Sequence, residues 1–220
     1  MSVVTPDGGL TALGYGLCAA AAAILLLIAG IVTKSSKSRL STRQLVFCGL
    51  AMALSFVTSY IKVFHMPYGG SVTLFSMLFI CLIGYWYGIR TGILTGLAYG
   101  ILQFLQEPFV LSPFQVCCDY VLAFAGLGLA GAFAKSKNGL VKGYLLGILV
   151  RGAFHSLGGY LYWMDYMPET FPASLAAVYP LVYNYSYILT EGVLTLIVIC
   201  LPPVKKGLEQ IRKMALAVTP

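Results

Sequence analysis

The sequence predicts an all-helical integral membrane protein, and three observations support this fold class. The chain has 220 residues, of which 59% are hydrophobic and only 10% are charged, whereas soluble domains carry roughly 25% charged residues. The apolar residues form long segments of roughly 20 residues, the length that a transmembrane helix needs. Within these segments they do not alternate with polar residues, as the strands of a membrane barrel require. A helical membrane bundle follows.

Seven apolar segments are expected to cross the membrane: 11–33, 43–64, 72–89, 91–106, 114–134, 140–163 and 175–201. The first is interpreted as a true span, because its apolar run is longer than that of a signal peptide and no basic residue precedes it. The chain is therefore divided into an extra N-terminal transmembrane helix with a basic linker (1–38), a six-helix membrane domain (39–204) and a basic cytoplasmic tail (205–220).

The positive charge of the chain follows the expected topology. The basic residues gather in alternate connections and in the C-terminal tail: Lys34, Lys37, Arg39, Arg43, Arg90, Lys135, Lys137, Lys142, Lys205, Lys206, Arg212 and Lys213. The opposite connections hold Glu107, Asp165 and Glu169, and Lys62 is their only fixed positive charge. Because basic loops stay in the cytoplasm, the N-terminus is expected outside and the C-terminus inside. The net charge of +7 thus implies no nucleic-acid partner.

Four ionisable side chains fall inside the core spans, where each costs at least about 2.5–3.5 kcal/mol to insert: Asp119, Arg151, His155 and Glu191. Asp119 lies about two turns after Pro113, a suitable first helical residue, so its carboxylate is recessed but reachable from outside. It could accept hydrogen bonds from an aminopyrimidine or pair with a cation, and the alternative is a structural pair with Arg151. For Glu191, which is about as deep as Arg151, a buried ion pair between the two is the simplest interpretation.

Two helix faces carry polar and aromatic residues at four-residue steps. The first is Arg151, His155, Gly159 and Trp163, and the second is Tyr179, Tyr183, Tyr187 and Glu191, with Asn184 beside it. A row of cation, imidazole, bare backbone and indole fits a polar cavity that opens outward, although a lone buried histidine is more often a satisfied core residue. With Tyr99 and Tyr120, the aromatic residues could form a cage for an organic cation. The residues alone predict an outward-facing site for a small, planar ligand that is cationic or bears an amine.

Small residues recur at four-residue spacing in two places, a pattern that lets helix backbones approach closely in lipid. One row is Gly92, Gly96 and Gly100, and the other is Gly49 and Ala53. Packing within the chain is the simpler interpretation of such rows. An interface for another membrane subunit is the alternative.

Two longer motifs resemble those of a known protein family. The runs Met66 to Leu74 (MPYGGSVTL) and Leu111 to Phe124 (LSPFQVCCDYVLAF) resemble the thiamine-specific substrate-binding (S) components of energy-coupling factor transporters. The face from Arg151 to Trp163 and the segment from Tyr179 to Asn184 resemble the same family, and the similarity covers roughly residues 39 to 202. The resemblance implies a protein of the bacterial cell membrane that binds thiamine from outside with high affinity. Its implied partners are one transmembrane coupling subunit and two ATPase subunits, which would drive uptake, and the surrounding membrane lipid.

The resemblance also implies which residues bind the vitamin. Asp119 stands where the family has an acidic residue facing the aminopyrimidine, Trp163 corresponds to a stacking ring, and Asn184 to a polar contact. The other implied pocket residues are Tyr99, Gln103, Tyr120, Arg151, His155, Gly159 and Tyr179, of which Tyr99 and Gln103 replace Trp and His of some relatives. Gly49 and Ala53 align with the small-residue motif that meets the coupling subunit.

Two other functions stay open on the sequence alone. The same machinery could carry another pyrimidine-containing vitamin or precursor, because a fold does not fix its cargo. A small membrane enzyme could use His155 and Asp119 as a general-base pair, but no Gly-x-Ser-x-Gly or His-Glu-x-x-His motif is present. No phosphate-binding Gly-x-x-x-x-Gly-Lys-Ser/Thr loop is present either, so ATP hydrolysis would fall to partners. The cysteines lack metal-ligand spacing, and neither a metal nor a cofactor is expected.

Overall fold

Six helical segments form the core of the protein. The computed structural model describes residues 5, 10–16, 40–67 and 69–217. Within these residues the core segments are α2 (Thr42–Ser59), α3 (Ser76–Tyr87), α4 (Ile89–Gln106), a composite helix over 113–133, α7 (Gly139–Tyr162) and α8 (Tyr179–Cys200). By length and composition, α2, the composite helix, α7 and α8 can each cross a membrane, and α3 is a shorter apolar helix. The helical membrane bundle is thereby confirmed, whereas the predicted first span lies outside the described residues apart from 11–16.

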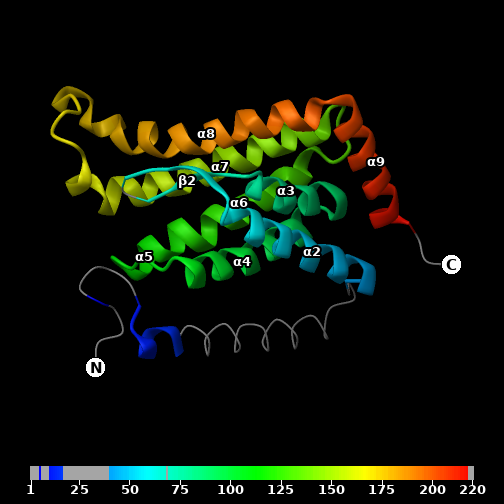
Figure 1. Ribbon diagram of the computed structural model, residues 1–220, viewed down its shortest axis with the longest axis horizontal. Coiled ribbons are helices and arrows are strands. Elements are labelled where there is room, and N and C mark those ends of the chain that lie inside the picture. The colour runs from blue at the N-terminus through cyan, green and yellow to red at the C-terminus, as the bar shows by residue number, and fades with distance from the viewer. Residues whose placement is uncertain (1–4, 6–9, 17–39, 68, 218–220) are drawn as a thin grey trace.

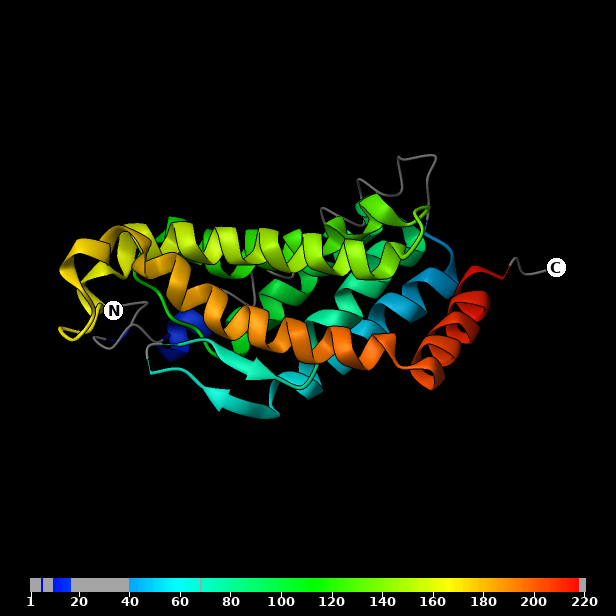
Figure 2. The ribbon, with the colours of Figure 1, turned by 90° about the horizontal axis from the view of Figure 1, so that it is seen from above.

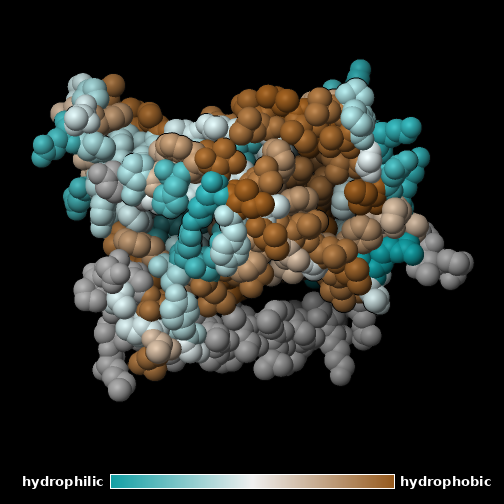
Figure 3. All heavy atoms as spheres, in the orientation of Figure 1, coloured by the Kyte–Doolittle hydropathy of each residue, from teal (hydrophilic) through white to brown (hydrophobic). Residues whose placement is uncertain are grey.

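The composite helix changes its winding along its length. It consists of α5 (Pro113–Val116), the π-helical η1 (Cys117–Leu122), α6 (Ala123–Leu127) and the 3-10 segment η2 (Gly128–Phe133). Two further 3-10 turns, η3 (Met164–Tyr166) and η4 (Ala173–Val178), connect α7 to α8, and Figures 1 and 2 show these two helices side by side along the bundle. Figure 3 shows hydrophobic side chains gathered between more hydrophilic residues at the two ends of this face, as expected for a protein in a bilayer.

A β-hairpin stands where a short loop was expected between two spans. α2 ends at Ser59 rather than at 64, and α3 begins at Ser76 rather than at 72, because β1 (Lys62–His65) pairs antiparallel with β2 (Ser71–Thr73). Gly69 and Gly70 make the turn with φ of 92° and 80°, which glycine adopts at little cost. The apolar residues of β1 suit a strand as well as a helix end, so hydropathy alone does not separate the two.

The row of small residues on α4 packs within the chain. A Cβ placed at Gly92 would lie 2.7 Å from the carbonyl oxygen of Gly128, and one at Gly96 would lie 2.3 Å from that of Phe124. α4 and the composite helix therefore meet backbone to backbone, as small residues allow in lipid. Of the two interpretations of Gly92, Gly96 and Gly100, intramolecular packing is confirmed.

Glu191 on α8 stabilises the start of α3. Its carboxylate accepts hydrogen bonds from the backbone N–H and the hydroxyl of Thr73, at 2.9 and 2.6 Å. It also accepts from the hydroxyl of Ser76 at 3.4 Å and from the N–H of Met77 at 3.3 Å. Phe75, the N-cap of α3, has a φ of 62° and provides no side-chain cap. A carboxylate from another helix thus satisfies free N–H groups and complements the positive end of the helix dipole.

The predicted basic tail is a helix. A single residue, Leu201, separates α8 from α9 (Pro202–Leu216), whose two leading prolines fit a first helical turn. Figure 1 shows α9 across one end of the bundle, beside the ends of α2 and α3. The basic tail was assigned over 205–220 from its charge, which does not reveal the apolar residues that pack α9 against the bundle.

Candidate ligand-binding cavity

The pocket residues predicted from the sequence gather at the end of the bundle opposite α9, around a cavity of about 680 Å³. A cavity of this size suits a small molecule, since ligand pockets typically measure about 300–1,000 Å³. It lies between the hairpin, the connection after α4, η1, α7 and α8. The predicted residues that line it are Gln103, Asp119, Tyr120, Arg151, His155, Gly159, Trp163, Tyr179 and Asn184.

Tyr99 is the exception, because it lies behind the cavity wall. Its side chain is fully buried, and its hydroxyl donates to the carbonyl oxygen of Ser55 at 3.0 Å. Its ring meets that of Phe124 edge-on, with the ring centroids 5.1 Å apart, and Phe124 is the ring that faces the cavity. The face of α4 that carries Tyr99 packs inside the bundle, which sequence spacing does not distinguish from a cavity face.

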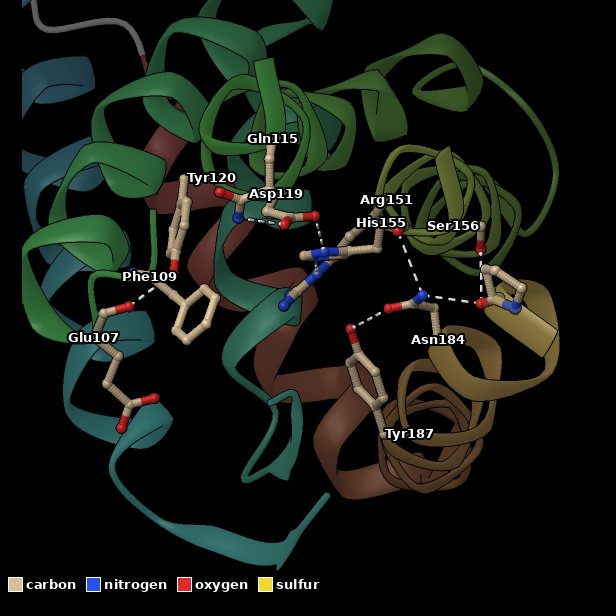
Figure 4. A network of polar contacts seen from close by, with 11 residues as sticks. Glu107, Phe109, Gln115, Asp119, Tyr120, Arg151, His155, Ser156, Asn184 and Tyr187 are labelled. Atoms are coloured by element: carbon tan, nitrogen blue, oxygen red, sulfur yellow. Dashed lines mark hydrogen bonds and ion pairs between the residues drawn. The ribbon is translucent and has the colours of Figure 1, made fainter. Parts of the chain in front are cut away.

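A chain of hydrogen bonds joins the polar groups of the cavity (Figure 4). Gln115 Nε2 donates to Asp119 Oδ2 at 2.7 Å, and Asp119 Oδ1 lies 3.2 Å from His155 Nδ1. On the other side of the imidazole, Arg151 Nε lies 3.3 Å from His155 Nε2. The side chains of Asp119 and His155 keep 14% and 13% of their surface exposed, so the pair faces the cavity. The partners of Asp119 are thus His155 and Gln115 rather than Arg151.

This chain of hydrogen bonds fixes the tautomer of His155. Arginine can only donate, so His155 Nε2 must be the unprotonated nitrogen that accepts from Arg151 Nε. The hydrogen therefore resides on Nδ1, which donates it to the carboxylate of Asp119. The cavity presents a neutral imidazole and a carboxylate that retains lone pairs for a ligand.

The guanidinium of Arg151 contacts the ring of Phe124 and the imidazole of His155 rather than a carboxylate. Its guanidinium lies over the ring of Phe124, 4.4 Å from the centroid, a cation–π contact. The predicted ion pair between Arg151 and Glu191 is wrong, because the N-terminus of α3 supplies the donors for that carboxylate. Arg151 lines the cavity and can meet a hydrogen-bond acceptor there.

The position of Asp119 depends on the start of the composite helix. Ser112 Oγ accepts from the N–H of Gln115 at 3.0 Å and caps the helix, which then widens into the π-helical η1. Such π-helical turns are frequent at functional sites. Gln115 is 1% exposed and also accepts from the N–H of Leu111 at 3.0 Å, which holds its amide toward Asp119. Sequence reasoning missed Gln115, although the Ser-x-x-Gln pattern of a capping box marks it.

Gly159 and Asn184 lie where α7 and α8 pack against each other. A Cβ at Gly159 would lie 3.0 Å from Pro180 Cβ and 3.1 Å from Asn184 Nδ2, so this glycine allows close helix approach as well as lining the cavity. Asn184 Nδ2 donates to the carbonyl oxygens of Pro180 and His155, at 2.9 and 3.3 Å. Its Oδ1 accepts from the hydroxyl of Tyr187 at 3.0 Å. With both amide hydrogens used, Asn184 can meet a ligand only through Oδ1.

Aromatic rings form the outer wall of the cavity. The ring of Trp163 lies 4.7 Å from that of Phe109, at an interplanar angle of 32°, and 5.1 Å from that of Tyr166. On the α8 side, the rings of Tyr179 and Tyr183 lie 5.8 Å apart. Phe109 was missed because it lies in an irregular connection, where no helical period predicts the direction of a side chain.

The connection between α4 and the composite helix carries Phe109 and contacts both Tyr120 of η1 and Lys62 of the hairpin. Tyr120 Oη donates to the carbonyl oxygen of Glu107 at 2.7 Å and accepts from the N–H of Phe109 at 3.1 Å. The carboxylate of Glu107 pairs with Lys62 of the hairpin. These contacts connect the rim of the cavity to the composite helix and to the hairpin.

Known proteins of similar sequence are thiamine transporters by name. The sequence model of the family described as Thiamine transporter protein (Thia_YuaJ) matches residues 45–210. The chain is 32% identical over 150 residues to the thiamine transporter ThiT of Bacillus subtilis, a match that covers 62% of this chain and 76% of that protein. It is 26% identical over 173 residues to ThiT of Lacticaseibacillus paracasei, which covers 70% of this chain and 81% of that one.

A solved structure of ThiT from Listeria monocytogenes has a similar fold. The TM-score is 0.57, and the match covers 73% of this chain and 94% of that chain at 22% sequence identity, so the likeness concerns the fold alone. Membership of the family comes from the sequence matches. Because the family model spans most of the chain and the Bacillus protein is 32% identical over 76% of its length, this chain belongs to the thiamine transporter protein family.

Proposed function

We propose that this chain binds extracellular thiamine with high affinity, as the substrate-binding (S) component of an energy-coupling factor uptake transporter. The observation that carries the proposal is the Asp119–His155 pair, which faces a cavity walled by Trp163 in a member of the thiamine transporter protein family. The two relatives compared above are both named thiamine transporters.

The cavity offers contacts for both halves of thiamine. The aminopyrimidine bears an amino group, and the remaining lone pairs of Asp119 and of Asn184 Oδ1 can accept its hydrogens. The thiazolium is a planar cation, and an aromatic face such as that of Trp163 attracts it by about 0.5–2 kcal/mol. Because Arg151 repels a cation, the thiazolium is expected on the Trp163 side of the cavity and the aminopyrimidine beside Asp119.

The geometry favours binding over chemistry on the ligand. A general base needs a free lone pair within reach of the proton that it removes. The lone pair of His155 Nε2 accepts from Arg151 Nε, and Nδ1 donates to Asp119. We therefore assign no general-base role to His155, and ATP hydrolysis for uptake would belong to the two partner ATPase subunits.

The proposed orientation places the cavity outside the cell and α9 in the cytoplasm. At the α9 end, Lys135 and Lys137 lie in a connection, and Arg43, Arg90 and Lys142 lie in the first turns of α2, α4 and α7. Basic residues at the ends of membrane spans stay on the cytoplasmic side. The C-terminus is then cytoplasmic. An outside N-terminus depends on the predicted span over 11–33.

One face of α2 is proposed as the contact with the transmembrane coupling subunit. Gly49 and Ala53 are exposed, and no atom of the described residues lies within 4 Å of a Cβ placed at Gly49. Leu50 and Val57 beside them are 54% and 60% exposed. Small residues on an uncovered apolar face allow another membrane helix to approach closely.

Binding and uptake assays with two proteins test this proposal. The purified wild-type chain should bind radiolabelled thiamine without any partner, and unlabelled thiamine should compete more strongly than other pyrimidine-containing vitamins or precursors. Gly49→Leu should bind thiamine as the wild type does, because its cavity is intact, yet lower uptake in cells with the coupling module by at least about tenfold. A stronger pyrimidine competitor would assign the cavity to another cargo, and normal uptake by Gly49→Leu would remove this face of α2 from the interface.

A further inference from the structure

Both ends of α9 are held at the same depth relative to the membrane. Only Leu201 separates it from α8, which can cross the membrane, so its first turn lies where the chain leaves the hydrocarbon. At its other end, Tyr87 Oη at the end of α3 donates to the carbonyl oxygen of Ala215 at 3.0 Å, and Arg43 at the start of α2 donates to that of Ala217. Figures 1 and 2 show the helix crossing the end of the bundle. Its axis therefore runs along the membrane surface.

One side of α9 packs against the bundle and sets the rotation of the helix. Ala215 is 3% exposed, and Leu208 packs against the main hydrophobic core. The guanidinium of Arg212 lies over the ring of Tyr85, 4.8 Å from its centroid, and Arg212 Nη1 donates to the hydroxyl of Tyr85 at 3.3 Å. The other sides of α9 are consequently turned away from the protein.

The outward sides of α9 differ in chemistry. Ile211 and Met214 are three residues apart and hence neighbours on the helix surface, and they are 41% and 63% exposed. Lys206 and Lys213 are seven residues apart, which places them together on another side, and both are exposed. An apolar strip beside a basic strip, on a helix parallel to the membrane, is typical of interfacial helices.

The charge around α9 matches an anionic surface. Glu209, the single acidic residue of α9, lies within about one helical turn of Lys205, Lys206 and Lys213, so these lysines outnumber it and leave the exposed surface of α9 basic. Lysines close to a membrane are attracted by anionic headgroups with about 1 kcal/mol each. An acidic lipid surface therefore fits this face better than a zwitterionic one.

We propose that α9 binds anionic phospholipids at the membrane–water interface. Lys206 and Lys213 would contact the headgroup phosphates, while Ile211 and Met214 would enter the boundary of the acyl chains. This inference does not depend on the cargo, because it needs only the membrane bundle and the contacts of α9. Bound lipid would then hold the bundle at a fixed depth.

Titration of the full chain in a neutral detergent with dioctanoyl-phosphatidylglycerol, followed by native mass spectrometry, tests the inference. The wild type should retain this lipid in preference to dioctanoyl-phosphatidylcholine. Lys206→Gln/Lys213→Gln should lower the apparent affinity for phosphatidylglycerol roughly 30-fold, since each lysine near an anionic surface contributes about fivefold. The matched control is Lys135→Gln/Lys137→Gln, which removes the same charge at the same end from a turn that lacks an apolar strip beside its lysines, and it should lower the affinity for phosphatidylglycerol less than Lys206→Gln/Lys213→Gln does.

Three outcomes would overturn the inference. The first is equal retention of the two lipids by the wild type. The second is equal affinity of the two double variants for phosphatidylglycerol. The third is unchanged lipid affinity of Lys206→Gln/Lys213→Gln together with lost co-purification of the coupling subunit, which would make α9 a protein interface.

Ile211→Ser/Met214→Ser, with the lysines intact, should also retain less phosphatidylglycerol than the wild type.

Discussion

Asp119→Asn is expected to weaken thiamine binding roughly 10- to 100-fold, because a hydrogen bond to a charged group contributes about 1.5–3 kcal/mol. The substitution keeps the volume of the side chain and removes the charge that faces the cavity. Equilibrium titration of the purified chain measures the effect. Asp165→Asn is the matched control, because Asp165 is exposed in η3 and does not line the cavity.

The same titration with the isolated aminopyrimidine half of thiamine identifies which half Asp119 contacts. A similar loss for both ligands is expected, because the carboxylate is proposed to accept from the aminopyrimidine. A loss confined to thiamine would instead place the cationic thiazolium beside Asp119. If Asp119→Asn and Asp165→Asn bind thiamine equally well, Asp119 does not contact the ligand.

Glu191→Ala is expected to lower the free energy of unfolding by about 3 kcal/mol, because it removes the acceptor of the buried N–H of Met77 and of the part-buried N–H of Thr73. For a chain of this size the melting temperature should fall by roughly 6–12 °C. Thermal unfolding in detergent, followed by circular dichroism, measures the change. Glu209→Ala, on the exposed side of α9, should shift stability by less than about 0.5 kcal/mol.

A double-mutant cycle separates this role of Glu191 from the ion pair that the sequence suggested. Because Arg151 contacts His155 and Phe124 instead of Glu191, the effects of Glu191→Ala and Arg151→Met should add within about 0.5 kcal/mol. A coupling energy well above that value would mean that the two charges interact in the folded protein. Equal melting temperatures for Glu191→Ala and Glu209→Ala would remove the capping role.

Helical spacing was sufficient to predict one wall of the cavity. Arg151, His155, Gly159 and Trp163 recur every four residues, and the structure places them along the cavity side of α7. This prediction succeeds because the relative direction of side chains on one helix depends only on local geometry. The depth of each span follows from hydropathy in the same local way.

The partners of the polar groups depend on how the helices are rotated against one another, which the sequence does not give. Similar depth favoured Glu191 as the partner of Arg151, and Asp119 was the other candidate, but the structure pairs neither acid with Arg151. The hairpin and the π-helical η1 were not predicted for a related reason, since their hydrogen bonds do not follow the period of an α-helix. The burial of Tyr99 inside the bundle was not predicted either, because the packing of α4 decides which side of that helix is buried.

Tryptophan fluorescence tests most directly whether the cavity holds the vitamin. The chain has two tryptophans, and Trp86 on α3 packs against Phe47, with ring centroids 6.0 Å apart, and does not line the cavity. In Trp86→Phe, thiamine should quench the emission of Trp163 with saturation at one site per chain. In Trp163→Phe, the emission of Trp86 should stay constant. Bound thiamine that leaves Trp163 emission unchanged, or alters only that of Trp86, would contradict the account.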